Sequence, residues 1–372
     1  MRVGVVAGTR LPGNVRTLLS NIQRLLSKHP KEFDLDIVLS ENVNAPEGYN
    51  QVDPGFGEPT RALETLRTLT CGVTHYAQRQ DIDLLFQVTK FPLHGCATTI
   101  AGHRTGTPVL TRFAGDNFRE FRLSSGVEAV KTFSLNNVLG RVPIHLSDRV
   151  IVLGPAGREV IASRNGDVPI SEIPQPVNRE QFSPVSSDCE RALATELGIP
   201  TSQRVLLTVG RLTERKGMRT VVETAKQLTT CNRPFRWYVL GEGPMKEELV
   251  ATPGIKPLGR VNFEQIADYY RVADLVVHPS QVEGLPNVLL EATACGTPTV
   301  ARDVGDCKLV ASATFEDDSQ LPALLTQDHD PVALGDRFNE KTLSDQYAKV
   351  LTKTASDTDR KKIDDMKEFT NA

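Results

Sequence analysis

Short apolar runs alternate with segments of helical apolar spacing along nearly the whole chain. Runs typical of buried strands occupy residues 3–7, 35–39, 84–88, 109–113, 150–153, 204–210, 235–240, 255–258, 275–277 and 298–301. Helical spacing marks intervening segments, notably 16–28, 60–78, 218–228, 245–250, 263–272 and 334–352. Strands that alternate with helices predict an α/β fold, in which parallel sheets are covered by helices on both faces.

A proline-rich interruption lies near the middle of the chain. Pro169, Pro174, Pro176 and Pro184 break up polar sequence there, and prolines at this density favour an extended linker. A chain of 372 residues is also too long for one ordinary core. We therefore predict an N-terminal domain at 1–170, a linker at 171–187, a C-terminal domain at 188–352 and a charged helix or tail at 353–372.

Charge and composition exclude several classes of protein. The formal net charge of −3 gives no basic footprint for nucleic acid. No apolar run approaches the ~18 residues of a membrane span, and the apolar start is too short before Gly8 for a signal peptide. The six cysteines contain no Cys-x-x-Cys pair, which suits reduced, mostly buried thiols better than disulfides or a zinc site. We expect a cytoplasmic protein without a bound metal.

The stretch 277–291 joins an apolar run, a Pro-Ser turn and a helical pattern. Glu283 and Glu291 are eight residues apart in it, which corresponds to about 12 Å along a helix. The unpaired amides at the helix start, from Gly284 to Asn287, suit a phosphate. Two carboxylates on either side of that phosphate could bind the hydroxyls of a nucleotide sugar. In the alternative interpretation, Glu283 caps the helix and Glu291 is solvated.

A basic loop follows the first strand of the second half. It carries Arg211 and Lys216 between Gly210 and Gly217, at the carboxyl end of the strand, where open α/β sheets bind ligands. Two cations on a departing diphosphate would stabilise the charge that develops as its bond to a sugar breaks. The alternative is that this is a solvated basic loop. The pair Glu283 and Glu291, predicted at the matching edge of the same sheet, makes that alternative less favoured.

The N-terminal loop from Gly8 to Gly13 matches neither a dinucleotide fingerprint nor a phosphate loop, because Asn14 stands where the latter needs lysine. The loop could approach a ligand through its backbone, and a plain tight turn fits at least as well. A nicotinamide dehydrogenase is therefore the weakest interpretation. Two Asp-x-Asp sequences, at 34–36 and 81–83, precede strands and are interpreted as surface acids rather than metal ligands.

Several motifs of the second half occur in an order that resembles a known family. They are Val209-Gly210-Arg211-x4-Lys216-Gly217, Leu240-Gly241-Glu242-Gly243-Pro244, Leu258-Gly259-Arg260-Val261, and the run from Ala273-Asp274 through Glu283-Gly284-x-Pro286-Asn287-x3-Glu291-Ala292 to Cys295-Gly296-Thr297-Pro298. This set resembles the group 1 (family 4) retaining glycosyltransferases of GT-B fold, closely over 200–350 and more loosely before. The resemblance implies two Rossmann-like domains facing across a cleft, sugar transfer from a nucleoside diphosphate sugar with retention, and no metal or other cofactor.

The resemblance also implies a role for each matched residue. Arg211 and Lys216 would bind the donor diphosphate. Glu283 would contact the transferred sugar and Glu291 the ribose. The other implied donor-binding residues are Gly284, Leu285, Pro286 and Asn287 at the helix start, Gly241, Gly243, Gly259, Arg260 and Val261 around the base, and Gly8 and Gly13 on the far wall of the cleft.

One departure from the family concerns the first domain. Many members place a histidine after a strand there, close to the reacting sugar, whereas this chain has the segment 109–117. Asp116 is the natural substitute as hydrogen-bond acceptor or base, and turn capping is its alternative role. His94 and His103 lie upstream and are interpreted as structural or exposed.

The sequence as a whole predicts a metal-independent glycosyltransferase that acts on a glycan, lipid-carrier or small-molecule hydroxyl. Lipid acceptors are common in the family and would bring peripheral contact with the inner face of the membrane. Arg10, Arg112, Arg119 and Arg122 are too sparse to argue such docking. Two rival hypotheses are a nucleotide-sugar epimerase on the same architecture and a catalytically silent protein that binds nucleotide sugars.

Overall fold

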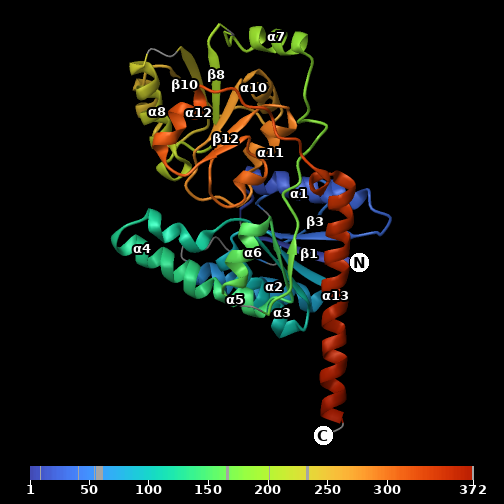
Figure 1. The fold of residues 1–372 in the computed structure, drawn as a ribbon. Helices are drawn as coiled ribbons and strands as arrows, with labels where there is room; N and C mark the ends of the chain where they lie inside the picture. Colours follow the sequence, from blue (N-terminus) through green and yellow to red (C-terminus); the bar gives the residue numbers. More distant parts are fainter. Residues whose placement is uncertain are drawn as a thin grey trace. The chain divides into compact units, whose positions relative to one another are not determined.

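The computed structural model of the chain describes residues 1–8, 10–40, 42–53, 55, 62–164, 167–200, 202–231 and 234–370, with the backbone alone at 358–370. The chain forms two compact units (Figure 1). Met1–Pro176 and Asp336–Ala372 make the first unit, and Val177–Gly335 makes the second.

The first unit is built on seven parallel strands in the order β3-β2-β1-β4-β5-β6-β7. The strands are β1 Arg2–Gly8, β2 Asp34–Leu39, β3 Asn50–Val52, β4 Leu84–Gln87, β5 Val109–Phe113, β6 Arg149–Val152 and β7 Ile170–Glu172. The helices are α1 Gly13–Ser27, α2 Ala62–Arg79, α3 Phe91–Thr105, η1 Asn117–Leu123, α4 Gly126–Phe133, η2 Ser134–Leu139, α5 Arg141–Leu146, α6 Pro155–Ala162, η6 Asp336–Phe338 and α13 Glu340–Thr370.

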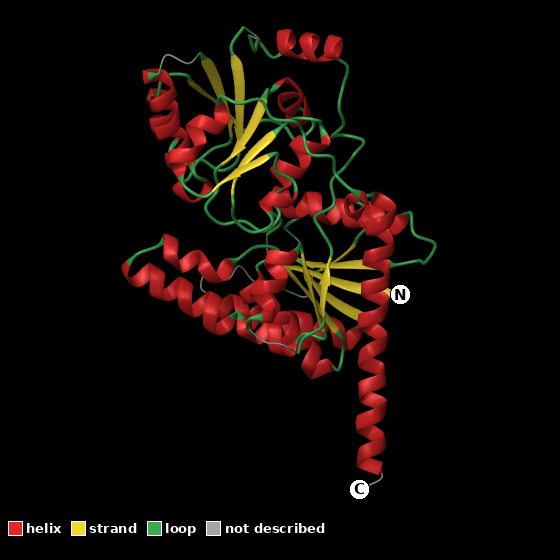
Figure 2. Ribbon diagram, viewed as in Figure 1, coloured by secondary structure: helices red, strands yellow, loops and turns green. Residues whose placement is uncertain are grey.

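Both faces of this first sheet are buried. Alternate residues of β1 point to opposite faces, so Val3 and Val5 pack with α1 and α13 while Val6 packs with α2 and α3. Burial on both faces explains why the strands have continuous apolar runs rather than alternating ones. Figure 2 shows this layered arrangement, with α13 running alongside the sheet and continuing beyond it.

The second unit repeats the plan with six parallel strands in the order β10-β9-β8-β11-β12-β13. The strands are β8 Arg204–Val209, β9 Phe235–Leu240, β10 Ile255–Gly259, β11 Leu275–His278, β12 Thr299–Arg302 and β13 Ala313–Phe315. The helices are α7 Ser187–Glu196, η3 Glu214–Lys216, α8 Met218–Thr230, α9 Lys246–Ala251, α10 Ile266–Val272, α11 Asn287–Ala294, η4 Cys307–Leu309, η5 Asp318–Gln320 and α12 Leu321–Leu325. One core cluster is centred on the buried Trp237 of β9 and includes Val221 and Leu249.

The α/β architecture is confirmed, but the domain boundaries differ from the predicted ranges. The predicted linker 171–187 contributes to β7, which adds a strand to the first sheet. The predicted C-terminal domain, 188–352, is too long because its last segment belongs to the first unit. Leu343 and Tyr347 of α13 are buried in the first core, and Glu340 accepts hydrogen bonds from Arg24 and Lys28 of α1. The predicted tail at 353–372 continues this helix as far as Thr370.

Four smaller expectations are also corrected. Gly13 is the first residue of α1 rather than part of an open loop. Helix α10 begins at Ile266 without a side-chain cap, so the expected start at residue 263 is one turn too early. Asp36 is fully buried and bonded to Arg2 and Tyr76, so it is no surface acid. Three of the six cysteines are exposed. Positions 60 and 61 of the helix expected at 60–78 lie outside the described residues.

Candidate active site

The second sheet reverses its strand order between β8 and β11, which are neighbours although β9 and β10 lie between them in sequence. Crevices outside the carboxyl ends of parallel strands at such a reversal are the usual ligand sites of open α/β sheets. The loop after β8 carries Arg211 and Lys216, and the loop after β11 carries Glu283. The topology therefore places the predicted charged groups at one edge of one sheet.

Lys216, Glu283 and His278 form a cluster at this edge, in which His278 is buried and the other two are half-buried. The ammonium of Lys216 donates a hydrogen bond to Glu283 Oε1, and His278 Nε2 lies 3.1 Å from the same oxygen. The His278 and Glu283 side chains are 4% and 13% exposed. Burial alone would raise the pKa of Glu283, but hydrogen bonding from His278 and the positive charges of His278 and Lys216 lower it from its ordinary value. Glu283 is therefore a firmly ionised carboxylate.

The two loops that carry this cluster are joined through their backbones. Gln281 donates its amide to the carbonyl of Arg215 at 3.0 Å. Gly217 has φ +77°, and a Cβ there would lie 2.1 Å from the carbonyl oxygen of Pro279. Only glycine allows this left-handed backbone and this close approach together. The contact holds Lys216, one residue before Gly217, next to the β11 loop.

The start of α11 faces this cluster with unpaired amides. Its N-cap is Pro286, with no capping side chain, so Glu283 is not the helix cap of the alternative interpretation. The amides of Gly284, Leu285 and Asn287 donate to no described acceptor. Free amides at the positive end of a helix dipole suit an anion.

Glu291 lies in the second turn of α11 and is buried rather than solvated. Its Oε2 accepts a hydrogen bond from the hydroxyl of Tyr270 at 2.9 Å. Burial raises the pKa of Glu291 to about 7, although the Tyr270 hydroxyl opposes the shift. The carboxyl group is therefore poised to change its protonation state near neutral pH.

The predicted base-binding glycines lie where loops pack closely on one another. A Cβ on Gly241 would lie 1.8 Å from the carbonyl oxygen of Gly210, and one on Gly243 would lie 2.5 Å from that of Leu212. Gly259 has φ +76° and accepts a hydrogen bond from the Gly241 amide. Close packing or a positive φ therefore requires glycine at these positions. Their role in binding the base remains a prediction.

Two predicted cations at this edge are exposed. Arg211 follows β8 and forms no ion pair with any described residue. Arg260 is exposed and follows β10, and its neighbour Val261 is half-buried. Arg211 is thus available to a ligand, whereas Lys216 is already held by Glu283.

The first sheet has its own reversal, between β1 and β4. Gly8 ends β1 with φ +84°, and a Cβ there would lie 2.5 Å from Cε1 of His94. His94 is buried, and its Nδ1 lies 2.8 Å from the Thr89 hydroxyl. Burial is the main cause that lowers the pKa of His94 to about 3, and the positive charge of Lys90 lowers it further. Gly13 is exposed on α1 with open space around it. The buried and hydrogen-bonded His94 fits its interpretation as a structural residue, and it lies beside this switch point.

Asp116 follows β5, at the same carboxyl edge of the first sheet. It precedes η1 but makes no capping hydrogen bond, which removes the alternative role of a turn cap. Its Oδ2 lies 3.0 Å from Nε of Arg119, while Oδ1 is buried and has no partner among the described residues. Asp116 therefore keeps one acceptor oxygen free.

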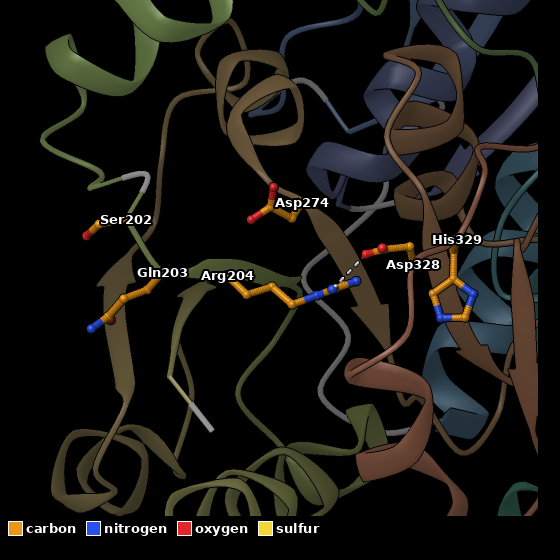
Figure 3. Close-up of a pocket in the computed structure, with 6 residues that line it drawn as sticks. All are labelled: Ser202, Gln203, Arg204, Asp274, Asp328 and His329. Atoms are coloured by element: carbon orange, nitrogen blue, oxygen red, sulfur yellow. Dashed lines mark hydrogen bonds and ion pairs between the residues drawn. The ribbon is translucent and has the colours of Figure 1, made fainter. Parts of the chain in front are cut away.

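A separate cavity of about 410 Å³ lies at the opposite edge of the second sheet (Figure 3). Its lining consists of Ser202, Gln203, Arg204, Asp274, Asp328 and His329. Arg204 starts β8 and pairs with Asp328 at 3.1 Å across the cavity wall. The cavity is thus at the amino ends of the strands, away from the predicted donor-binding residues. Among the described residues, no helix is long and apolar enough to cross a membrane, and no cluster of acidic, histidine or cysteine residues could hold a metal.

Comparisons with known proteins give a family match for part of the chain and structural neighbours for the whole fold. Residues 203–340 match the family Glycosyl transferases group 1. Sucrose-phosphate synthase from Thermosynechococcus elongatus superposes with a TM-score of 0.74 at 18% identity, covering 100% of both chains. The chain has the GT-B fold. Anabaena HepE, solved in complex with UDP and glucose, superposes with a TM-score of 0.64 at 15% identity over 99% of both chains.

A curated relative supports the same group. The D-inositol 3-phosphate glycosyltransferase of Nocardiopsis dassonvillei is 33% identical over 164 residues, which are 40% of this chain and 37% of the relative. The chain spans less than half the length of the curated relatives that it matches at this level of identity. The family match and this relative therefore show similarity to group 1 glycosyltransferases over less than half of the chain.

Proposed function

We propose that this protein transfers a sugar from a nucleoside diphosphate sugar to an acceptor hydroxyl, with the anomeric configuration retained. The observation that carries the proposal is the convergence of Lys216, Glu283 and the free amides of Gly284 to Asn287 at the switch point of the second sheet. A donor diphosphate needs cations and amides, and a donor sugar needs a fixed hydroxyl acceptor. This edge offers both.

The Lys216–Glu283 pair gives each partner a role. An ammonium group has three N–H donors, so Lys216 can keep its bond to Glu283 and still donate to a phosphate oxygen. The ionised Glu283 holds the cation in place and offers its second oxygen to a sugar hydroxyl. Exposed Arg211 adds a second cation for the diphosphate.

The proposed transfer step assigns a task to each of these residues. The bond between the sugar C1 and the diphosphate oxygen breaks, and a bond from C1 to the acceptor oxygen forms. Lys216, Arg211 and the α11 amides stabilise the charge on the departing diphosphate. Asp116, with its unpartnered Oδ1, is the acceptor-side carboxylate that we propose to bind or deprotonate the hydroxyl.

A structural neighbour supports the choice of donor. HepE is solved with UDP and glucose, and its fold extends over nearly all of this chain. We therefore propose a nucleoside diphosphate sugar as donor, a glycan or lipid-linked acceptor, and chemistry that needs neither metal nor other cofactor. Full activity in the presence of EDTA is the expected result for the last point.

The deciding experiment is donor turnover by wild type and by Lys216→Ala. A thermal-shift panel of nucleotide sugars first identifies the donor, since a ligand that binds the folded state raises its apparent stability. Lys216→Ala should then abolish transfer while the circular dichroism spectrum is unchanged. Lys226→Ala, an exposed lysine on α8, is the matched control and should transfer normally. Wild-type turnover by Lys216→Ala would remove the phosphate assignment.

The rival functions give different products. An epimerase converts its donor without any acceptor, so product analysis of donor alone identifies it. A silent binding protein shows a thermal shift with a nucleotide sugar but neither hydrolysis nor transfer across a broad acceptor panel. Transfer that requires an added acceptor supports the proposal over both.

A further inference from the structure

Arg302 is a further cation at the edge of the second sheet that carries Arg211 and Lys216. It is the last residue of β12, which neighbours β11, and its side chain is 14% exposed. A cation at this place would suit another contact to a phosphate. Its hydrogen bonds indicate a different role, because all three nitrogens of the guanidinium donate to acceptors of the protein itself.

The acceptors of Arg302 belong to three separate parts of the unit. Its Nε donates to the carbonyl of Pro279 in the loop after β11 at 3.3 Å, and Nη1 donates to the carbonyl of Glu316 at 3.3 Å. Its Nη2 donates to the Thr220 hydroxyl, in the first turn of α8, at 3.3 Å and also to Asp318 Oδ1. The Thr220 hydroxyl donates in turn to Asp318 Oδ2 at 3.0 Å, which closes the network.

The network depends on the shape of a guanidinium as well as on its charge. A guanidinium holds five N–H donors in one rigid plane, whereas a lysine ammonium is a compact group on a flexible stem. Phe315, the partner of Arg302 across β12 and β13, has its ring centroid 5.0 Å from Arg302 Cζ. Arg302 is therefore held both by its nitrogens and by an aromatic ring.

The network connects the two loops that carry the Lys216–Glu283 pair. Thr220 lies four residues after Lys216, at the start of the helix that follows the β8 loop. Pro279 lies four residues before Glu283, in the β11 loop. By bonding to both of these residues, Arg302 ties the β8 side of the pair to the β11 side.

The Pro279 carbonyl is the point at which these contacts meet. It accepts a hydrogen bond from Arg302, and it is the same carbonyl that lies against Gly217, where a Cβ would come within 2.1 Å. The β11 loop is held further along as well, since the Gly284 carbonyl accepts the amide of Asp306 at 2.8 Å. The end of β12 and the turn after it therefore hold both ends of the segment that presents the carboxylate of the pair.

We propose that Arg302 is a positioning residue for donor binding and transfer. It keeps the two loops at the separation at which the Lys216 ammonium reaches Glu283 and the donor diphosphate together. Without its guanidinium the Pro279 carbonyl loses a donor, and the loops are free to separate. A displacement of about 1 Å in a reacting group can cost about 100-fold in rate. This inference rests on the proposed function, which assigns Lys216 to the diphosphate.

The first test is hydrogen exchange, resolved to single amides, in Arg302→Met. Methionine keeps an apolar stem over Phe315 but removes every donor. The amide of Gln281, which bonds to the carbonyl of Arg215 at 3.0 Å between the two loops, should exchange about tenfold faster. Unchanged exchange of this amide would overturn the proposal.

Arg271→Met is the matched control for that measurement. The Arg271 side chain is 15% exposed and likewise donates from all three nitrogens, but its acceptors lie outside the β8 and β11 loops. It should leave the exchange of the Gln281 amide as in wild type. Equal acceleration in both variants would show a general loss of stability and would also overturn the proposal.

The second test asks whether Arg302 acts through Lys216. UDP, GDP and ADP are titrated in turn by calorimetry, and Arg302→Met should bind the one that wild type prefers about tenfold or more weakly. The same substitution in the Lys216→Ala background should weaken binding no further, because the two changes remove one interaction. A loss by the same factor in both backgrounds would contradict the positioning role.

Arg302→Lys tests the need for the planar group and guards against unfolding in the methionine variant. It keeps the charge, and its thermal midpoint should stay close to that of wild type. Its kcat with the donor identified by the thermal-shift panel should still fall about 10-fold to 100-fold, because one ammonium cannot reach all of the acceptors. Wild-type kcat in Arg302→Lys would overturn the role assigned to the guanidinium.

This proposal and the proposed function fail in different ways. If wild type binds none of the three diphosphates and transfers no sugar, the proposed function falls, and the Gln281 amide alone then decides whether Arg302 holds the loops together. If wild type transfers sugar and Arg302→Met matches it in exchange and in turnover, only the role of Arg302 falls.

Discussion

His278 Nε2 lies 3.1 Å from Glu283 Oε1, the same oxygen that accepts a hydrogen bond from Lys216. Both partners therefore act on one carboxylate oxygen. No described residue donates to the other oxygen, Oε2. The arrangement keeps Glu283 ionised and leaves one of its oxygens for a ligand.

Glu283→Gln should lower turnover by about 100-fold to 1000-fold, the usual range for loss of a fixed electrostatic group. The amide has nearly the same shape but cannot neutralise Lys216. Transfer rates at saturating donor measure the effect, and Glu264→Gln, an exposed glutamate of the same unit, should have no effect. Turnover by Glu283→Gln within about twofold of wild type would show that the charge of Glu283 is not used.

Removing the imidazole should change the pH dependence of donor binding. Folding lowers the pKa of Glu283 below its value in the unfolded chain. The ionised carboxylate therefore stabilises the folded state at pH values above the unfolded pKa, and this stabilisation is lost as the pH falls through the folded pKa. His278→Phe deletes the hydrogen bond and one charge, so the pKa of Glu283 rises and the acid limit of donor binding moves to higher pH. Calorimetric titration of donor across mildly acidic and neutral pH measures the shift.

His278→Gln is the matched control, because its amide can still donate to Glu283. It should retain an acid limit closer to that of wild type. An unchanged pH profile in His278→Phe would show that the histidine serves packing alone.

The sequence was a good guide to this site where function depends on local motifs. Glu283 and Lys216 were found because each follows a strand that apolar runs identify. His278 was missed because it is the last residue of β11 and looks like part of the strand. Only the three-dimensional contact shows that its ring reaches Glu283.

Ionisation of Glu291 should make the second unit less stable as the pH rises. Its folded pKa is raised from 4.5 to about 7, so the unfolded chain loses its proton first. The stability is therefore full below about pH 4.5, falls as the pH approaches 7 and is constant above it, with a change on the order of 3 kcal/mol. Urea unfolding followed by Trp237, the single tryptophan and a core residue of this unit, measures it.

Glu291→Gln provides the comparison for that experiment. Its amide oxygen can still accept the Tyr270 hydroxyl but cannot ionise. The decline in stability between pH 4.5 and 7 should disappear in this variant. A decline of the same size would mean that another group of the unit titrates there.

Gly217→Ala should destabilise the second unit and weaken donor binding together. The added Cβ meets the carbonyl of Pro279, so the loops that carry Lys216 and Glu283 must separate. Gly198→Ala is the control, because Gly198 also has positive φ but open space around it. Gly198→Ala should cost about 1 kcal/mol from backbone strain alone, and Gly217→Ala clearly more. Equal losses of unfolding free energy for the two variants would show that the backbone at Pro279 shifts away from the added Cβ at little cost.

Domain assignment was the weakest part of the sequence-based picture, for a physical reason. The apolar spacing of α13 predicts a helix but not the sheet against which its apolar face packs. Only side-chain contacts show that Leu343 and Tyr347 complete the core of the first unit. Proline density likewise marked the linker without showing that Ile170–Glu172 pairs with β6.

Tyr347→Ala should therefore destabilise the first unit although it lies after the second in sequence. The side chain is fully buried among residues of β1, α1 and β5, and removing a large buried aromatic group typically costs about 3–5 kcal/mol. Hydrogen exchange of β1 and β4 should accelerate, while the unfolding transition reported by Trp237 stays in place. Tyr347→Phe keeps the ring and should lose much less. A shift of the Trp237 transition without faster exchange in β1 would instead place α13 with the second unit.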